Sequence, residues 1–287
     1  MAEDSLDRTI TDVTLVTVTY NSEKMAEFFA QSARLFEQVV IADNHSSDAT
    51  VVKFGREIPH AKILSLVKNI GFGPGNNAGL RQVKTPYALL MNPDCKIDAK
   101  DVMRLRDYAQ MFESAAIVGP RIYGTDGSEH PTFRWDFRRK YKTNKYPELC
   151  GPVSTVAGSG CCFLVNVKNF MSIHAFDENI FMYYEEDDIG LRAIAAGLDV
   201  ISVPDAMAEH IGSASSAPSM HSQYIKSYHM LRSKLIMLGK YSGRSAVWIA
   251  RAKVILIGPL ALALFALTLQ KKQLIKWFAR LRAAISV

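Results

Sequence analysis

Residues 13–22 read Val-Thr-Leu-Val-Thr-Val-Thr-Tyr-Asn-Ser, an apolar and β-branched run that ends in a polar loop. A short apolar run bounded by turn-forming residues is typical of a strand buried on both faces of a sheet. The pattern returns at residues 38–48, where Gln-Val-Val-Ile-Ala-Asp is followed by Asn-His-Ser-Ser-Asp. Residues 23–35 between the two runs have a helical pattern, so we expect two parallel strands joined by a crossover helix.

The alternation of strands and helices continues along the first two thirds of the chain. Further strands are predicted at residues 63–67, 87–91 and 200–203, the last ending before Pro204, and further helices at residues 76–83, 98–112 (with Asp98 as the N-cap) and 185–196. This order predicts an α/β domain with a mostly parallel central sheet. From residue 223 onward the pattern is helical. We therefore expect one domain over residues 1–220 and a helical tail over residues 221–287.

The composition excludes several classes of protein. The chain has 287 residues, of which 48% are hydrophobic and 22% are charged, so a disordered or collagen-like chain is excluded. Its four cysteines lack CxxC spacing, which argues against a disulfide scaffold or a zinc site. Residues 1–8 carry acidic side chains and no apolar core segment, so we expect no signal peptide and reduced cytosolic thiols.

The charge is distributed unevenly. Up to Glu209 the chain has 22 basic and 28 acidic residues, whereas the rest has 12 basic residues and no acidic one. An anionic membrane surface and nucleic acid are both partners for such a tail. Residues 254–269 are an uncharged run of 16 residues containing Pro259, which a nucleic-acid-binding role does not require. The tail is therefore expected to bind a membrane and not nucleic acid.

The tail has a second apolar pattern. In the segment after the uncharged run, Leu274, Phe278, Leu281 and Ile285 share one helical face, with basic residues between them. This pattern is typical of an interfacial helix on an anionic leaflet. The 16-residue run would be about 24 Å long as a helix, short of the ~30 Å hydrocarbon core. Peripheral attachment is expected, and a core or dimer-forming helix pair is the alternative.

Polar loops follow three of the predicted strands. They are residues 19–22, 43–48 and 92–94, and they meet at one edge of a parallel sheet, where α/β proteins bind ligands. A glycine-rich loop at residues 69–79 opens a helix and could present backbone N–H groups to a phosphate. Each loop alone could consist of ordinary turn and cap residues. Together they favour a polar ligand of nucleotide size.

The order and spacing of these pieces resemble the family 2 glycosyltransferases, which are inverting enzymes with a GT-A fold. Within that family the sequence is most similar to bacterial rhamnosyltransferases of cell-surface polysaccharide and O-antigen (lipopolysaccharide) synthesis. The resemblance covers about residues 13–238 and rests on residues 18–22, 43–48, 69–72, 90–94, 119–121, 126–128, 160–164, 176–178 and 181–189, with Asn77, Gly79, Arg192, Gly197, Pro204, Ala206, His210 and Ser213.

The resemblance implies a site for a nucleotide-diphosphate sugar and a divalent cation. The implied donor-binding residues are Thr19, Tyr20, Asn21, Asp43, Asn44, Asn69, Gly71, Phe72, Asn77, Asn92 and Asp94. The DxD-type motif becomes Asn92-Pro93-Asp94 here, so Asp94 is the expected metal ligand, with His210 beside it. Mg²⁺ or Mn²⁺ suits such a sparse site of oxygen ligands.

The acidic cluster Glu185-Glu186-Asp187-Asp188 corresponds to the family element that carries the catalytic base. Alignment on Arg192 places Glu186 at the position of the base, where the family pattern has Asp. Asp187, Asp188 and Glu185 remain alternatives. Four carboxylates at the start of a helix also complement its dipole, which is a purely structural explanation.

The acceptor is expected to be a glycan on a polyprenyl diphosphate. A basic and aromatic stretch could contact its diphosphate or lipid head groups, and the expected acceptor-binding residues are Arg134, Trp135, Arg138 and Arg192. The predicted reaction transfers L-rhamnose from dTDP-L-rhamnose at the cytoplasmic face of the cell membrane. A UDP-hexose or UDP-N-acetylhexosamine donor is one alternative, and a catalytically silent membrane scaffold is another. A homo-oligomer is also compatible with the sequence.

Overall fold

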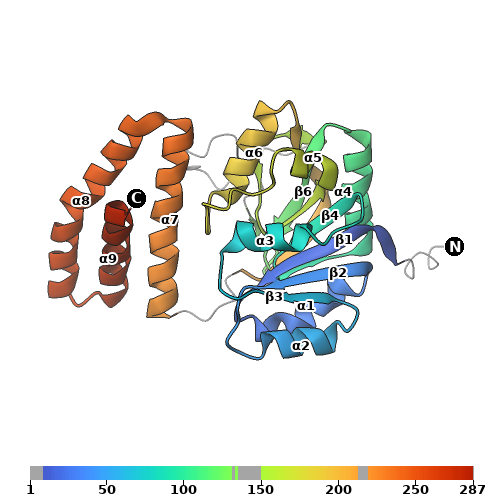
Figure 1. Cartoon of the computed structure of the whole chain (residues 1–287), viewed down its shortest axis with the longest axis horizontal. Coiled ribbons are helices and arrows are strands. Elements are labelled where there is room, and N and C mark those ends of the chain that lie inside the picture. Colours follow the sequence, from blue (N-terminus) through green and yellow to red (C-terminus); the bar gives the residue numbers. More distant parts are fainter. Residues whose placement is uncertain (1–8, 131–132, 135–149, 213–218, 287) are drawn as a thin grey trace. The chain divides into compact units, whose positions relative to one another are not determined.

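The computed structural model describes residues 9–130, 133–134, 150–212 and 219–286. The chain divides into two compact units (Figure 1). The sheet unit comprises Met1–Asp177 and Glu186–Ser215, and the helical unit comprises Glu178–Glu185 and Ser216–Val287. The predicted division into a domain over residues 1–220 and a membrane-binding tail over residues 221–287 stays a prediction.

The sheet unit contains a mixed sheet whose main strand order is β3-β2-β1-β4-β11-β6-β12-β5. Its strands are β1 (Ile10–Thr19), β2 (Phe36–Asp43), β3 (Lys62–Ser65), β4 (Tyr87–Met91), β5 (Cys95–Ile97), β6 (Ala115–Tyr123), β7 (Glu129–His130), β9 (Val153–Ser154), β11 (Cys162–Asn166) and β12 (Asp199–His210). Strands β3, β2, β1 and β4 are parallel, and β6 is parallel to β12. Strand β11 is antiparallel to both of its neighbours, and β5 is antiparallel to β12. A separate ribbon pairs β8 (Phe133–Arg134) with β10 (Ala157–Gly158).

Helices cover both faces of the sheet. The sheet unit contains the 3₁₀ turn η1 (Glu23–Met25) and the helices α1 (Ala26–Ala33), α2 (Thr50–Glu57), α3 (Phe72–Leu80), α4 (Ala99–Met111), α5 (Val167–Ser172) and α6 (Glu185–Ala195). Leu15 of β1 belongs to a core formed with α1, α2 and α4, whereas the next residue, Val16, belongs to a core formed with α3, α5 and α6. Successive side chains of a strand point to opposite faces, so the apolar run of β1 serves both cores.

The GT-A-like α/β fold expected from the sequence is confirmed, with a mixed and mostly parallel sheet. The strand predicted at residues 87–91 is β4 itself, and the helix predicted at residues 98–112 is α4. Asp98 occupies the N-cap position of α4, but its side chain makes no capping hydrogen bond.

The strand predicted to end before Pro204 is wrong in its extent. Strand β12 continues through Pro204 to His210, with a shift of register against β6 between Ser202 and Met207. Proline lacks an N–H and is tolerated in a sheet at such irregular positions. Strands β5 and β6 have no counterpart among the predicted elements, because β5 is short and β6 contains Gly119 and Pro120.

The helical unit is built from three helices. They are α7 (Met220–Tyr241), α8 (Gly243–Leu267) and α9 (Lys271–Ser286). Leu231 and Leu235 of α7 form a buried cluster with Val254, Ala283 and Ala284. The buried face of α9 thus consists of alanines, while Phe278 and Ile285 of the predicted apolar face are exposed.

Helix α8 passes through Pro259 without a break and contains 25 residues. At 1.5 Å per residue its length is about 37 Å, more than the ~30 Å hydrocarbon core. Within the described ranges, it is the one helix long and apolar enough to cross a membrane, with a mean hydropathy of 1.9 over an 18-residue window that is 17% buried. Helix α8 is thus longer than the 16-residue uncharged run because it begins before Val254, and the expected peripheral attachment stays a prediction.

The close packing of α3 on β1 yields a testable prediction. A Cβ atom at Gly79 would lie 2.6 Å from Val16 Cγ1, whereas one at Gly55 of α2 would lie 3.5 Å from Ile63 Cδ1. Gly79→Ala should lower the free energy of unfolding by about 1–3 kcal/mol through overpacking. The matched change Gly55→Ala should be neutral or stabilising by up to ~1 kcal/mol, because alanine favours a helix. Urea unfolding measures both, and equal stability of the two variants would contradict this packing.

Candidate active site

The carboxyl ends of β1 and β2 are joined by a buried carboxylate. Asp43 Oδ1 accepts a hydrogen bond of 2.9 Å from the Thr19 hydroxyl, and Asp43 Oδ2 accepts one of 2.9 Å from the Ser46 N–H. The Ser46 hydroxyl also donates to Asp43 Oδ1. An ionised carboxylate has about four acceptor positions. Asp43 therefore anchors the loop after β2 and keeps capacity for one further donor.

Asn44 ties the glycine-rich loop to the same edge of the sheet. Its Nδ2 donates to the carbonyl of Gly71 at 2.8 Å, and its Oδ1 accepts from the N–H of Ile70 at 3.2 Å. Its own N–H donates to the carbonyl of Thr19 at 2.8 Å. Gly71 has φ +101°, in the region that favours glycine, and it is the N-cap of α3. One side chain thus connects β1, β2 and the start of α3.

The neighbouring residues predicted to bind the donor differ in their contacts and in their exposure. Asn21 supports the loop after β2, since its Oδ1 accepts from Ser47 N–H at 2.8 Å. Asn69 Oδ1 accepts from Gly71 N–H at 3.0 Å, and the Phe72 ring packs edge-on against Phe176. Tyr20 is 44% exposed, so its ring is available to a ligand.

Strand pairing brings Asp94 and His210 together, although they are far apart in sequence. Cys95 and His210 are register partners in the β5–β12 pair, and Ile211 N–H donates to the carbonyl of Asp94 at 3.0 Å. Asp94 is 2% exposed, and its Oδ1 lies 3.4 Å from His210 Nε2. The interaction with Asp94 raises the pKa of His210 above its ordinary value, against the opposing effect of burial.

The ligand atoms of Asp94, Cys95 and His210 lie within 4.8 Å of one another. A carboxylate oxygen suits Mg²⁺ or Mn²⁺, whereas an imidazole nitrogen suits a transition-metal ion such as Mn²⁺ better than it suits Mg²⁺. Burial raises the pKa of the Cys95 thiol well above its ordinary value, and a soft thiol is a poor ligand for a hard cation such as Mg²⁺. The donor set thus fits the expected metal through Asp94 and His210.

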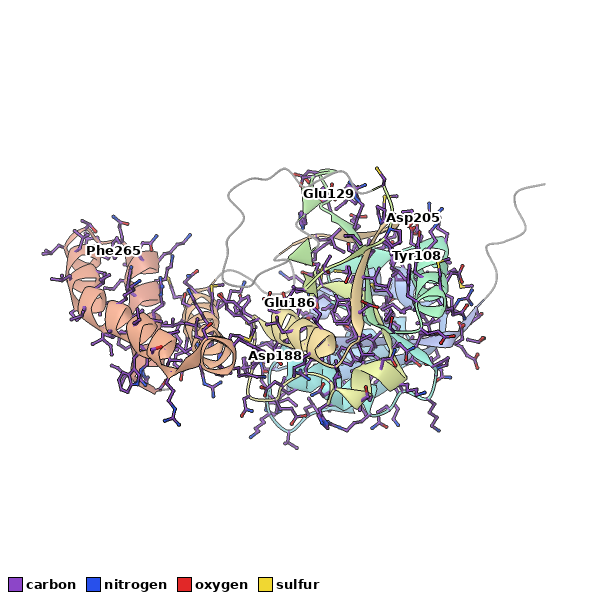
Figure 2. The ribbon with its side chains drawn as sticks, turned by 90° about the horizontal axis from the view of Figure 1, so that it is seen from above. Tyr108, Glu129, Glu186, Asp188, Asp205 and Phe265 are labelled. Carbon is purple, nitrogen blue, oxygen red and sulfur yellow. The ribbon has the colours of Figure 1, made fainter. Side chains whose placement is uncertain are left out.

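The four acidic residues at the start of α6 differ in exposure. Glu185, Asp187 and Asp188 are buried, whereas Glu186 is intermediate. Figure 2 labels Glu186 and Asp188 on α6. Asp188 Oδ2 accepts from Arg192 Nε at 2.8 Å, which commits it to an ion pair within the helix. Glu186 is therefore the carboxylate of this cluster that a substrate can reach most readily.

Gly160 and Cys161 connect the acidic cluster to the metal-binding loop. The Glu186 carboxylate lies against Gly160, where an added Cβ would be 3.4 Å from Glu186 Oε1. The carbonyl of the next residue, Cys161, accepts from Asn92 N–H at 2.8 Å. These residues belong to the resemblance, but the sequence assigns them no role. Their small size before a strand is the signal that could have identified them.

Two residues expected to contact substrates make hydrogen bonds to the main chain of the protein itself. The Asn77 carboxamide donates to the Phe176 carbonyl at 2.9 Å and accepts from the Phe176 N–H at 3.1 Å. Arg192, besides its ion pair with Asp188, donates to the carbonyls of Ile173 and Ala175. We therefore assign structural roles to Asn77 and Arg192. Trp135 and Arg138 lie outside the described residues, as does the side chain of Arg134.

The family model described as "Glycosyl transferase family 2" matches residues 14–173, more than half of the chain. This chain belongs to glycosyl transferase family 2. It is 29% identical over 236 residues to the N-acetylglucosaminyl-diphospho-decaprenol L-rhamnosyltransferase of Mycobacterium tuberculosis, a match that covers 70% of this chain and 76% of the relative. A low-salt glycan biosynthesis hexosyltransferase of Haloferax volcanii is 27% identical, over 66% of this chain and 64% of its own length.

Solved structures agree with the GT-A fold. The mannosyltransferase PcManGT of Pyrobaculum calidifontis, solved with GDP-Man and Mn²⁺, has a TM-score of 0.56 at 14% identity, over 96% of this chain and 86% of that one. TarS of S. aureus has a TM-score of 0.54 at 15% identity, over 94% and 90%. GalNAc-T7, solved with UDP, GalNAc and Mn²⁺, has a TM-score of 0.55 at 14% identity, over 80% of this chain and 48% of that longer one.

In this family 2 chain, the role of Asn44 can be tested by changing a donor into an acceptor. Asn44→Asp removes the N–H donor to the Gly71 carbonyl and places a carboxylate beside it. We expect a loss of about 1–3 kcal/mol in the free energy of unfolding. Asn69→Asp is the matched control, because the oxygen that accepts from Gly71 N–H is kept. Thermal and urea unfolding should separate the two variants, and equal stability would show that Asn44 does not brace the loop.

Proposed function

We propose that the chain is an inverting, metal-dependent glycosyltransferase that transfers L-rhamnose from dTDP-L-rhamnose to a hydroxyl of a polyprenyl-diphosphate-linked glycan in cell-surface polysaccharide synthesis. The observation that carries the proposal is the position of Glu186. It is the half-buried carboxylate of the acidic cluster, and it lies against Gly160, next to the residue that holds the Asp94 loop. The choice of sugar and acceptor draws support from the name of the mycobacterial relative.

The donor is proposed to lie along the carboxyl edge of the sheet. Tyr20 and the segment from Asp43 to Asn44 would hold the nucleoside, with Asn69 and Gly71 beside it. Asp94 and His210 would hold Mg²⁺ or Mn²⁺ near the diphosphate. When bound, such a cation neutralises the charge that develops on the leaving diphosphate. The buried carboxylate of Asp94 is suited to this role because strand pairing holds it in place before the donor arrives.

Glu186 is proposed to act as the general base. Its carboxylate accepts the proton of the acceptor hydroxyl while that oxygen forms a bond to the anomeric carbon. The bond between the anomeric carbon and the diphosphate oxygen breaks on the opposite face, so the configuration inverts. The transition state has oxocarbenium character, as in other glycosyl transfers. A carboxylate next to solvent and beside buried carboxylates is suited to exchange a proton with the acceptor.

A second candidate keeps the fold and the base but changes the donor. The archaeal relative is named as a hexosyltransferase, so a UDP-hexose or UDP-N-acetylhexosamine remains the alternative donor. Incubation with a panel of labelled nucleotide sugars, a divalent cation and a GlcNAc-diphospho-polyprenol acceptor tests both candidates. Transfer of rhamnose supports the first proposal, and transfer of a hexose alone supports the second.

The helical unit is proposed to attach the enzyme to the cytoplasmic face of the cell membrane. Helix α8 exposes Trp248, Leu256, Leu260 and Leu267, each by 65% or more. Tryptophan at the end of an apolar helix is typical of the membrane interface. Basic residues of α9 would face anionic head groups. An acceptor on a lipid carrier would lie in the same membrane.

Glu186→Gln should lower kcat by ~100-fold to ~10,000-fold, because the shape is kept and the proton acceptor is lost. Donor affinity, measured by calorimetry, should stay within a factor of about two, well inside the tenfold change that corresponds to ~1.4 kcal/mol. Asp187→Asn and Asp188→Asn are the matched controls for the same cluster, with the melting temperature recorded for each. A fully active Glu186→Gln enzyme beside a folded but inactive Asp187→Asn enzyme would show that Glu186 is not the base.

The tail can be tested by vesicle flotation in rising salt. The full-length protein should float with anionic vesicles, and a fraction should stay bound in high salt because apolar burial is not screened. Replacing exposed Leu256 and Leu260 with Glu should abolish that salt-resistant fraction. The control Lys271→Glu with Lys272→Glu should weaken binding mainly at low salt. Full-length protein that never floats would contradict membrane attachment.

A further inference from the structure

The segment Glu178–Glu185 precedes α6 in the sequence, but it belongs to the same compact unit as the C-terminal helices. Helix α6 begins at Glu185, so the segment runs directly into the acidic cluster. The segment is therefore the stretch of chain that directly precedes Glu186.

Three neighbouring residues of α7 hold the segment. Arg232 Nη1 donates to the Asn179 carbonyl at 2.8 Å, and the Ser233 hydroxyl donates to the Met182 carbonyl at 2.7 Å. The His229 ring stacks on the Phe181 ring, with centroids 4.0 Å apart and an interplanar angle of 20°. Positions 229, 232 and 233 are spaced i, i+3 and i+4, so they share one face of the helix.

The His229 contact is aromatic in character. Burial, together with the nearby Arg232, lowers the pKa of His229 to about 4, so the ring is neutral at pH 7. A neutral ring stacked on Phe181 is a packing contact that another aromatic side chain can supply. Ser233 is fully buried, and its hydroxyl is satisfied by the Met182 carbonyl.

The end of the segment is strained. Tyr183 and Tyr184 are consecutive residues with φ +68° and φ +71°. Non-glycine residues are unfavourable in this left-handed region, and they persist only where the surrounding structure holds them. The contacts from α7 act on Asn179, Phe181 and Met182, immediately before the strained pair. Without them, the segment would relax toward ordinary backbone conformations.

We propose that the face of α7 formed by His229, Arg232 and Ser233 is a clamp that holds residues 178–185 in the conformation that orients Glu186 for transfer. These three are positioning residues for the reaction, and the inference rests on the proposed role of Glu186 as the base. The helical unit then has a second role besides membrane attachment. It holds the segment that leads into the catalytic helix.

Hydrogen–deuterium exchange of the full-length protein tests the clamp without any substrate. In His229→Ala and Ser233→Ala, amides of residues 178–185 should exchange at least tenfold faster than in the wild type. His229→Phe keeps an aromatic ring and should restore slow exchange. Lys234→Ala, an exposed change on the same helix, should leave the exchange of the segment unaltered. Unchanged exchange in both alanine variants would overturn the proposal.

Kinetics test the positioning role. Since misplacing a catalytic group by 1 Å can cost ~100-fold, kcat of His229→Ala should fall by ~10-fold to ~100-fold, with the KM for the donor unchanged and with recovery in His229→Phe. Fast exchange combined with wild-type kcat would overturn the positioning role. A wild-type protein that transfers no sugar from any donor would instead refute the proposed function, and the exchange experiment alone would then decide the clamp.

Discussion

The hydrogen bond from Asn92 N–H to the Cys161 carbonyl holds the candidate site together. It joins the loop after β4 to the start of β11, the strand inserted antiparallel between β4 and β6. One side of this junction leads to Asp94, which the β5–β12 pair places beside His210. The other side leads to Gly160, which lies next to the Glu186 carboxylate. The residues proposed to bind the metal and the proposed base are thus connected through the main chain of Gly160 and Cys161.

The sequence predicts regular, apolar elements well. The runs that become β1 and β2 are rich in β-branched residues, and the run that becomes β4 is short and apolar, so their patterns are sufficient. Strand β12 is not predictable to its full length, because Pro204 usually ends a strand and only the register shift against β6 accommodates it. His210 lies beyond that proline. Its placement beside Asp94 therefore depends on tertiary pairing that the local sequence does not encode.

In the candidate site, the roles of individual side chains also depend on tertiary contacts that the local sequence does not encode. The resemblance implies substrate contacts for Asn77 of α3 and Arg192 of α6, but both side chains make hydrogen bonds to the main chain of residues 173–176. A sequence motif identifies residues that are important for the site. It does not tell whether a given side chain contacts the ligand or supports the backbone. Burial and hydrogen-bond partners make that distinction, and they favour Glu186 over Asp188 in the same way.

The tail illustrates how helical packing selects a face. The sequence pattern favours an apolar face of large side chains on α9, yet the structure buries the alanines, which allow close approach between helices. Of the large apolar side chains of the predicted face, Phe278 and Ile285 are exposed, whereas Leu274 and Leu281 are half-buried. Because α7 packs on α8 and α9, deletion of everything after Tyr241 would expose Leu231 and Leu235. A truncation experiment should therefore keep or remove the helical unit as a whole.

The most direct measurement of the site is a crystal structure of the protein with Mn²⁺ and a nucleoside diphosphate, recorded with anomalous scattering from manganese. The account predicts an anomalous peak bonded to the Asp94 carboxylate and close to His210, with the diphosphate on its open side and the nucleoside along the carboxyl ends of β1 and β2. Glu186 should face the position of the anomeric carbon. A manganese peak held by the acidic residues of α6, with Asp94 and His210 unligated, would contradict the assignment of metal and base.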